Sequence, residues 1–483
     1  SNALGSNTTA DNNTAVGGGA LASNTTGTVN TAVGRSVLSA NTTGSYNVGM
    51  GVESLLSNTT GEVNVGIGNN SLRANTTASQ NTGVGTNAMY ANTTGADNAA
   101  FGHNSLDANT TGDNNTALGK SALGANTTAD NNTAVGYKAL HVNTTGANNV
   151  SIGYIALEAN TTGGKNVAIG GGALNRNTTA SDNTAVGDSA LADNTTGTAN
   201  SSLGKRALKS NTTANNNVAV GYHSLEENTT GQQNTAIGSS CLESQTQAGS
   251  NVGVGYAAGS SVTTGGANTL IGAFAGDKLT TASGNTLVGY NSGTYQTPEL
   301  TTGVANTMFG AYNTGTSATA NDQHGFGYNL DCAANFTTLG GGSTDSRLAF
   351  GGTSWAAVSD IRVKKDIKDA EAGLSFINDL RPVTFNYKTK GEIPDNFKGY
   401  EEGSTEAYKN EKTQHGFIAQ EVKEVIDNHD EITDGFKMWH ILDHTGQQEI
   451  AEGYLIPILT KAVQELSTTV DELKAEIQTL KGE

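Results

Sequence analysis

A pattern of small apolar and polar residues repeats every 17 residues along most of this chain. The block Asn13-Thr14-Ala15-Val16-Gly17 returns at Asn30 and then at every seventeenth position as far as Asn285. The next copy begins at Asn306, after a step of 21 residues, so the strict array ends there. A fixed period of this length is the signature of a repeat architecture, in which each unit stacks on its neighbours.

Each unit follows the order Asn-x-Ala-Val-Gly-x-x-Ala-Leu-x-x-Asn-Thr-Thr-Gly-x-x, where x varies. Its first residues alternate between small or polar and apolar side chains, which is typical of a short strand. The glycine permits a bend, and Asn-Thr-Thr-Gly supplies turn chemistry. We therefore predict a mainly β fold in which strand, turn, strand and turn make one rung of a β-solenoid. The asparagine at a fixed place in every rung is expected to stack into a ladder of side-chain amides.

The apolar content of one rung is small, about three side chains such as Ala15, Val16 and Leu21. Ordering each residue costs roughly 1–2 kcal/mol of backbone entropy, which so little apolar surface in a single coil hardly offsets. Three chains around a shared axis would pool these side chains, so the sequence favours a homotrimer. With strand layers about 4.8 Å apart, the seventeen rungs would form a rod on the order of 80 Å long.

Charge divides the chain into two parts near residue 359. Residues 1–358 hold 11 basic and 19 acidic side chains and residues 359–483 hold 15 and 25, which sum to the 26 and 44 of the whole chain. The net charge of -18 is thus shared as -8 and -10. This acidic balance disfavours nucleic acid as a partner, because phosphate binding needs clustered Lys and Arg.

The first 358 residues offer little other chemistry. Cys241 and Cys332 lie far apart in the sequence and are expected to be free thiols. The histidines His103, His141 and His223 are expected on the solvent-exposed surface, and the rungs suggest no metal, no cofactor, no His cluster and no paired carboxylates. No apolar run approaches the roughly 18 residues of a membrane span, so membrane insertion is not expected. The fourteen Asn-Thr-Thr triplets match the glycosylation pattern but are interpreted as turns.

Residues 291–358 keep short Gly-rich stretches, lose the period and gain aromatic side chains. Repeat arrays need atypical terminal units, so we interpret this region as an irregular β cap or neck. An exposed aromatic patch that contacts a glycan or receptor is the alternative. The aromatic residues concerned are Phe309, Phe326, Phe336, Phe350 and Trp355.

The Asn-x-Ala-Val-Gly rungs resemble the head repeats of the YadA-like trimeric autotransporter adhesins. The resemblance covers about residues 7–290. It implies a trimeric left-handed β-roll with a role in adhesion.

The last 125 residues carry three motifs in a fixed order. These are Ser359-Asp360-Ile361-Arg362-Val363-Lys364, then Arg381-Pro382-Val383-Thr384-Phe385-Asn386-Tyr387, then His415-Gly416-Phe417-Ile418-Ala419-Gln420-Glu421. Together they resemble the intramolecular chaperone auto-processing domain of phage tailspikes and fibres, which endosialidase tailspikes and myelin regulatory factor also carry. The resemblance implies a trimeric protein whose C-terminal domain assists assembly and then cuts itself off.

The resemblance also implies the residues that carry out the cut. The family's Ser-Asp-x-x-x-Lys motif falls on Ser359, Asp360 and Lys364. Ser359 would be the nucleophile and Lys364 its base, with the cut between Val358 and Ser359. The activity implied is that of a self-cleaving serine peptidase with a Ser-Lys dyad, which turns over once and needs no cofactor.

This chemistry places a demand on Lys364. A serine hydroxyl needs an adjacent base, and a lysine can serve as one only if its pKa falls below its usual value of about 10.4. Repulsion from Arg362 and Lys365 could contribute, and burial inside an assembled trimer would add desolvation. We therefore hypothesise that cleavage waits for assembly.

Three further features of the site stay open at this stage. An ester intermediate on Ser359 and direct attack by an activated water are both compatible with the sequence. The oxyanion partner is unassigned. Gln420 and Glu421 are candidates for the surroundings of the site, as are Asp360 and Arg362, but helix capping and packing explain Gln420 and Glu421 equally well.

The C-terminal end is predicted to form a coiled coil. Its apolar seam over four heptads combines one position, held by Ile456, Val463, Val470 and Ile477, with a second position three residues later, held by Leu459, Leu466, Leu473 and Leu480. β-branched residues at the first position with leucine at the second are typical of parallel dimers. We nevertheless predict three strands, since the attached domains constrain the helix and the resembled family is trimeric.

These patterns predict a trimeric phage tail fibre in the virion tail, made in the host cytoplasm, which binds a host-cell receptor, expected to be a glycan. A bacterial trimeric surface adhesin that retains its C-terminal domain is the alternative. A polysaccharide depolymerase is less favoured, because such enzymes need paired carboxylates in a groove. The predicted segments are an expression scar and lead-in at 1–6, the shaft at 7–290, the cap at 291–358, the chaperone domain at 359–454 and the coiled-coil helix at 455–483.

Overall fold

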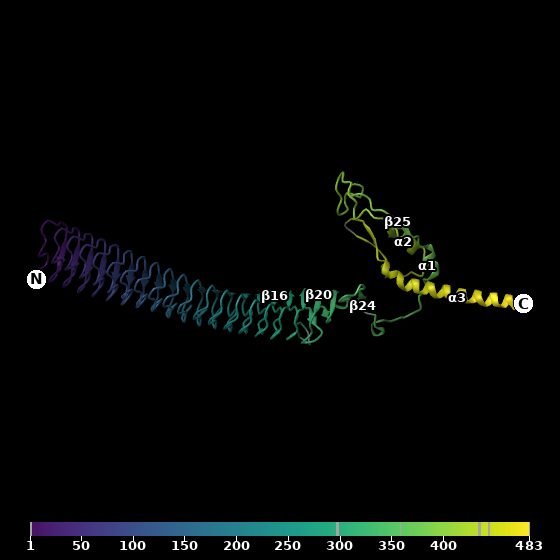
Figure 1. Cartoon of the computed structure of the whole chain (residues 1–483), viewed down its shortest axis with the longest axis horizontal. Helices are drawn as coiled ribbons and strands as arrows, with labels where there is room; N and C mark the ends of the chain where they lie inside the picture. Colours follow the sequence, from purple (N-terminus) through teal and green to yellow (C-terminus); the bar gives the residue numbers. More distant parts are fainter. Residues whose placement is uncertain (1, 296–298, 358, 433–435, 443–444, 483) are drawn as a thin grey trace. The chain divides into compact units, whose positions relative to one another are not determined.

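The computed structural model describes residues 2–295, 299–357, 359–432, 436–442 and 445–482. The chain divides into two compact units, Ser1–Val358 and Ser359–Glu483. The first is a β-solenoid with one strand per rung, and the second is a small α+β region with a long terminal helix (Figure 1). The predicted mainly β fold of 17-residue rungs is confirmed.

Every rung of the solenoid contributes one three-residue strand to a continuous parallel sheet. β1 lies opposite β2 residue for residue, and each later strand pairs with the next in the same way. The strands of the regular array are β1 (Thr14–Val16), β2 (Thr31–Val33), β3 (Val48–Met50), β4 (Val65–Ile67), β5 (Thr82–Val84), β6 (Ala99–Phe101), β7 (Thr116–Leu118), β8 (Thr133–Val135), β9 (Val150–Ile152), β10 (Val167–Ile169), β11 (Thr184–Val186), β12 (Ser201–Leu203), β13 (Val218–Val220), β14 (Thr235–Ile237), β15 (Val252–Val254), β16 (Thr269–Ile271) and β17 (Thr286–Val288).

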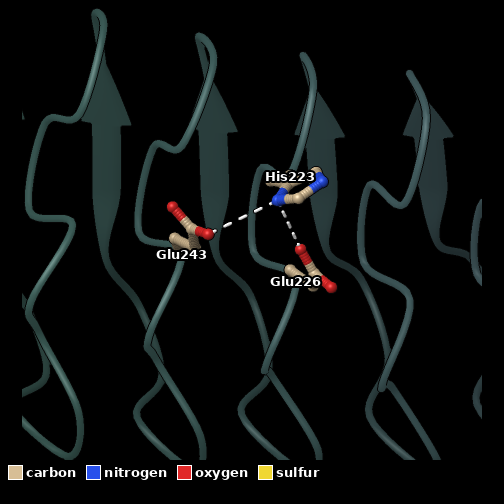
Figure 2. A group of neighbouring side chains, drawn as sticks. All are labelled: His223, Glu226 and Glu243. Atoms are coloured by element: carbon tan, nitrogen blue, oxygen red, sulfur yellow. Dashed lines mark ion pairs between the residues drawn. The ribbon is translucent and has the colours of Figure 1, made fainter.

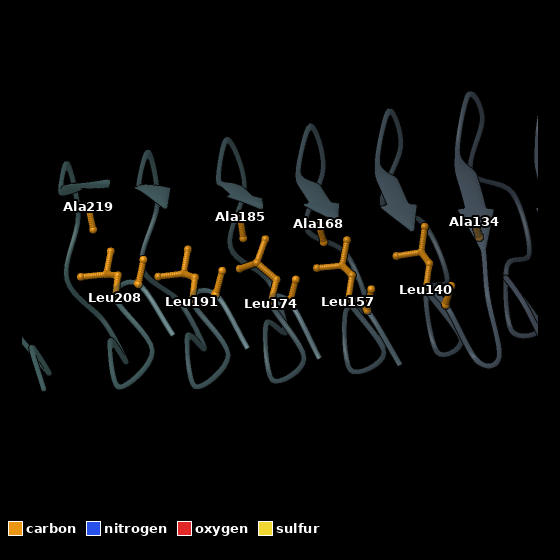
Figure 3. Packing of buried hydrophobic residues seen from close by; sticks show 14 of the residues in the cluster. Ala134, Leu140, Leu157, Ala168, Leu174, Ala185, Leu191, Leu208 and Ala219 are labelled. Carbon is orange, nitrogen blue, oxygen red and sulfur yellow. The ribbon is translucent and has the colours of Figure 1, made fainter. Parts of the chain in front are cut away.

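The interior of the coil is built from two columns of apolar side chains. The middle residue of each strand points inward, and Ala117 and Ala168 at this position are fully buried. A leucine six residues later completes the interior. Figure 3 shows Leu140, Leu157 and Leu174 following one another along the coil, and all three are fully buried. A single chain therefore encloses its own core.

The segment that contains this leucine is not the second strand that the sequence predicted. Leu38 and Leu140 have φ values of 52° and 51°, in the left-handed region that leucine rarely adopts. The chain turns there, and the Leu38 N–H donates to the carbonyl of Ser54 on the next rung at 3.1 Å. Each rung therefore holds one strand, and turns make up the rest.

The prediction that all three apolar side chains of a rung must be shared among chains is also wrong. Leu21 is fully buried within its own coil, whereas Val16 is 58% exposed. The third residue of each strand points outward, and these residues follow one another in register along the sheet. We call them the outer column. Its most exposed members are Val16, Met50, Ile67, Phe101, Leu118, Ile152, Leu203, Ile237, Ile271, Phe309, Phe326 and Leu339.

Ladders of buried asparagine amides run along the coil, as predicted. Asn109 donates to Asn92 Oδ1 at 2.8 Å and to the Gly112 carbonyl at 2.9 Å, and it accepts from Asn126 at 2.9 Å. The asparagine before each strand forms a second ladder, in which Asn115 is a typical member. These bonds satisfy the polar groups that the turns bring into the interior.

We expect Asn109→Ala to lower the free energy of unfolding of the shaft by about 2–4 kcal/mol, because it leaves buried partners on Asn92, Gly112 and Asn126 without their hydrogen bonds. Denaturant unfolding of the full chain, followed by circular dichroism, measures the change. Thr111→Ala, an exposed position in the same turn, is the matched control. Equal unfolding midpoints for the two variants would contradict a stabilising role for the ladder.

Beyond β17 the sheet continues while the period is lost. Three strands extend it in parallel and two more add to its end in antiparallel orientation. The antiparallel strands end the row of identical rungs, where an open edge would otherwise offer itself to other strands. The elements are β18 (Thr307–Phe309), β19 (Thr314–Gly315), β20 (Gln323–Tyr328), β21 (Asp331–Cys332), β22 (Phe336–Gly341), η1 (Gly342–Thr344), β23 (Ser346–Ala349) and β24 (Ala356–Ala357).

The second unit packs two short helices and two hairpins against the start of the long helix α3. Phe376 is fully buried in a core with Val422 and Ile458. Glu465 of α3 accepts the Leu374 N–H at 2.8 Å and so fixes the start of α1. No helix in the described ranges is long and apolar enough to cross a membrane. The elements are η2 (Ile361–Val363), α1 (Leu374–Asp379), β25 (Val383–Phe385), β26 (Gln414–Gly416), α2 (Ala419–Asp427), β27 (Trp439–Ile441), β28 (Gln448–Ile450), η3 (Glu452–Tyr454) and α3 (Leu455–Lys481).

Candidate functional site

Ser359 and Lys364 lie side by side at the start of the second unit. The Lys364 Nζ donates to Ser359 Oγ at 2.8 Å. One turn of 3-10 helix, η2, separates the two residues, and the Lys364 N–H closes it by donating to the Ile361 carbonyl at 3.1 Å. This short turn is what brings side chains five positions apart into contact.

Asp360 begins the same turn. Its carboxylate accepts the Arg362 N–H at 2.8 Å and the Arg362 Nε–H at 3.0 Å. The Arg362 guanidinium holds the pKa of Asp360 below its usual range. The ion pair also changes the expectation for Arg362, because its charge is offset by Asp360 and acts less on Lys364.

The pair has the contact that a nucleophile and its base require, but not the surroundings. Ser359 and Lys364 are both exposed to solvent in the single chain. A drier environment for the amine would have to come from other chains. The residue before the predicted cut, Val358, lies outside the described residues.

Gln420 and Glu421 lie in the first turn of α2. The Arg381 Nε donates to Glu421 Oε2 at 2.9 Å, and this guanidinium holds the pKa of Glu421 below its usual range. Glu421 thus ties α2 to the segment before β25. No hydrogen bond joins Gln420 or Glu421 to the Ser359–Lys364 pair within the part of the chain that the structure describes.

Comparison with known proteins starts at the same residue as this site. Residues 359–431 match the family described as chaperone of endosialidase. The match begins at Ser359 and includes Lys364, and it confirms the chaperone domain predicted from the three motifs. No curated protein and no solved structure matched the chain. The unit Ser359–Glu483 is called the chaperone domain below.

The chaperone domain contains a buried histidine that the sequence did not indicate. His429 Nε2 lies 2.8 Å from Asp379 Oδ2, and His429 Nδ1 lies 2.6 Å from Glu431 Oε1. Its ring meets the edge of Phe376 in the core. The carboxylates of Glu431 and Asp379 raise the pKa of His429 above its usual range. Asp379 lies 50 positions away in the sequence, so no local motif could have revealed the pair.

This histidine predicts that the chaperone domain is more stable in mild acid. Because the pKa of His429 is higher in the folded than in the unfolded chain, its contribution is complete below the unfolded value of about 6.5 and is lost as the pH rises through the folded value. We expect the melting temperature of the domain to fall by a few degrees from pH 6 to pH 8. His429→Gln should remove most of this dependence, and His440→Gln, at an exposed position, should preserve it. An unchanged pH dependence in His429→Gln would exclude this histidine as the cause.

The other predicted positions of the shaft fall in two groups. Cys241 and Cys332 are free and buried, as expected for the thiols, and burial raises the pKa of each to about 12. His103 is exposed as predicted, whereas His141 and His223 are only partly exposed, so that prediction is wrong for both. The predicted absence of a His cluster and of paired carboxylates is wrong at His223, which lies between two glutamates (Figure 2).

Proposed function

We propose that this chain is the shaft of a trimeric phage tail fibre, joined to a chaperone domain that drives assembly and is released by cleavage between Val358 and Ser359. One observation carries the proposal: a β-solenoid is followed directly by a segment that matches the chaperone of endosialidase from Ser359 onward. The shaft would adsorb to a receptor on the host surface, and a glycan is the chemistry we favour.

The geometry at Ser359 supports a self-cleavage reaction. In this reaction Ser359 Oγ attacks the carbonyl carbon that precedes its own nitrogen, and Lys364 takes the hydroxyl proton and passes it to the Ser359 nitrogen as the peptide bond breaks. Water then hydrolyses the ester. The 2.8 Å contact between Lys364 Nζ and Ser359 Oγ supports this assignment of roles. Direct attack by a water activated by the same amine would use the same two residues.

Two exposed apolar surfaces support the trimer. The outer column runs along the sheet of the shaft, and a second apolar seam runs along α3, where Ile456 and Val463 are each 65% exposed and Leu480 is 72% exposed. Soluble monomers rarely expose continuous apolar surface of this extent, and its usual fate is burial in an assembly. Each surface repeats along its element with one spacing, so identical chains could cover both.

Assembly would begin at α3. A coiled coil of three α3 helices brings the chains together before the shaft forms, which lowers the loop-closure cost of its β-structure. The burial that Ser359 and Lys364 lack in one chain would come from the assembled neighbours. Cleavage then removes the chaperone domain, and the shaft is left kinetically stable because the domain that assisted its folding is gone.

The proposal is tested by comparing the full chain with a chain that stops at residue 358. We expect light scattering to give a mass of three shafts for the full-chain product, and monomer or aggregate for the shortened chain. The assembled shaft should also adsorb to whole bacteria and lose adsorption when the surface polysaccharide is stripped. A shortened chain that yields the same trimer with the same efficiency would contradict an assembly role for the chaperone domain.

A further inference from the structure

Two columns of side chains on one flank of the solenoid face each other across neighbouring rungs. They are the second and the fifth residues after the glycine that follows each strand, so their contacts join residues 20 positions apart. Arg73 contacts Glu53 at 3.1 Å in this way, and Lys138 contacts Glu158 at 3.2 Å. The usual content of these contacts is therefore a cation next to an anion.

At His223 the pattern is different, because two carboxylates meet one imidazole. His223 Nδ1 lies 2.8 Å from Glu226 Oε2 and 3.5 Å from Glu243 Oε1. Glu226 and Glu243 hold the same place on successive rungs, and Figure 2 shows both carboxylates turned toward the same nitrogen. All three ligand atoms lie within 4.8 Å of one another.

The three side chains are held in place by their neighbours. His223 has φ 58° and its ring stacks on Tyr222 at 3.7 Å. Arg206 binds Oε1 of Glu226, which leaves Oε2 for the imidazole. The far ring nitrogen, His223 Nε2, is buried and has no hydrogen-bond partner among the described residues. All polar contacts of the ring thus converge on the point between the two carboxylates.

We propose that His223, Glu226 and Glu243 bind a divalent transition-metal ion of the Zn²⁺ class. Bonds of about 2.0–2.2 Å in a tetrahedral site place neighbouring ligand atoms roughly 3.3–3.5 Å apart. The distance from Nδ1 to Glu243 Oε1 is already 3.5 Å, and the 2.8 Å distance to Glu226 Oε2 must open slightly, which a small rotation of Glu226 supplies. One position is left for water.

Charge and ligand type favour this class of ion. With Arg206 offsetting one carboxylate, the cluster around a neutral imidazole carries one excess negative charge. Imidazole suits zinc, copper and nickel, whereas magnesium and calcium prefer oxygen ligands alone. The ion would link the rung of β13 to the rung of β14 through Glu226 and Glu243. The site lies within one chain, so the inference goes beyond the proposed function and does not depend on cleavage or on the number of chains.

The test is calorimetric titration of the full chain, stripped of metal by a chelator, with Zn²⁺ and separately with Mg²⁺. We expect one Zn²⁺ per chain, no saturable Mg²⁺ binding and loss of the Zn²⁺ signal in His223→Ala. Glu243→Gln, which removes one ligand from a partly exposed position, should weaken binding at least about tenfold. Glu227→Gln changes the same charge at the exposed neighbouring position and should bind as the wild type does.

Two outcomes would overturn the inference. Zn²⁺ binding by His223→Ala equal to that of the wild type would place the ion elsewhere, for example on surface carboxylates or on a thiol such as Cys241, which this variant retains. Absence of saturable Zn²⁺ binding in the wild type would leave the cluster as an ion-pair network held by a proton. Circular dichroism shows whether His223→Ala is folded, and if it is not, Glu243→Gln against Glu227→Gln decides the question.

Discussion

Ser359→Ala protein is expected to remain one full-length chain on a denaturing gel, under conditions in which the wild-type chain separates into a shaft and a chaperone fragment. Removing the hydroxyl removes the nucleophile, and loss of a nucleophile slows such reactions by at least about a thousandfold. The comparison is made on freshly expressed protein and followed over time. Cleavage of Ser359→Ala at the wild-type rate would exclude Ser359 as the nucleophile.

The lysine is tested with a neighbour as its control. Lys364→Ala and Lys364→Arg should both stop cleavage, because arginine keeps the positive charge but cannot give up its proton at neutral pH. Lys365→Ala removes the same charge one position further on and should leave the fragments unchanged. If Lys364→Arg cleaved normally, the amine would be a source of charge and not a base.

The second large effect is expected from the seam of α3. The double variant Val463→Asp/Leu466→Asp places charges on both positions of the predicted coiled coil, and burying an unpaired carboxylate is costly. We expect the particle mass to fall from three chains to one and the rate of cleavage to fall at least about tenfold, since the site would then stay exposed. Light scattering and gel densitometry measure the two effects on the same sample.

The matched control places the same charges on the outer side of the helix. Thr468 and Ala475 are exposed and lie opposite the seam, so Thr468→Asp/Ala475→Asp should assemble and cleave as the wild type does. A seam variant that is monomeric and still cleaves at the normal rate would show that the Ser359–Lys364 pair is complete within one chain. The link between assembly and cleavage would then be lost.

The fold of the shaft was predictable because its repeat fixes every neighbour. Residues one rung apart are identical in role, so the strand, the glycine bend and the asparagine ladder could be placed from the period alone. The left-handed backbone of Leu38 and its equivalents could not, because apolar spacing carries no information about the sign of φ. The same gap misplaced Val16, which the strand alternation turns outward once Ala15 is assigned to the interior.

The candidate sites follow the same division between local and distant partners. Ser359 and Lys364 are five residues apart, so a motif could name both, and one short turn joins them. The contact of His223 with Glu243 spans 20 residues, one period plus three, and was within reach of a sequence that had been aligned rung by rung. His429 and Asp379 belong to the irregular chaperone domain, where no period relates distant residues.

The most direct test of the account is the intact mass of the wild-type chain after purification in its assembled form. The account predicts two species, one ending at Val358 and one beginning at Ser359, whose masses sum to that of the full chain plus one water. A folded, assembled preparation that shows only the full-length mass would contradict it, and the adhesin that keeps its C-terminal domain would become the better description.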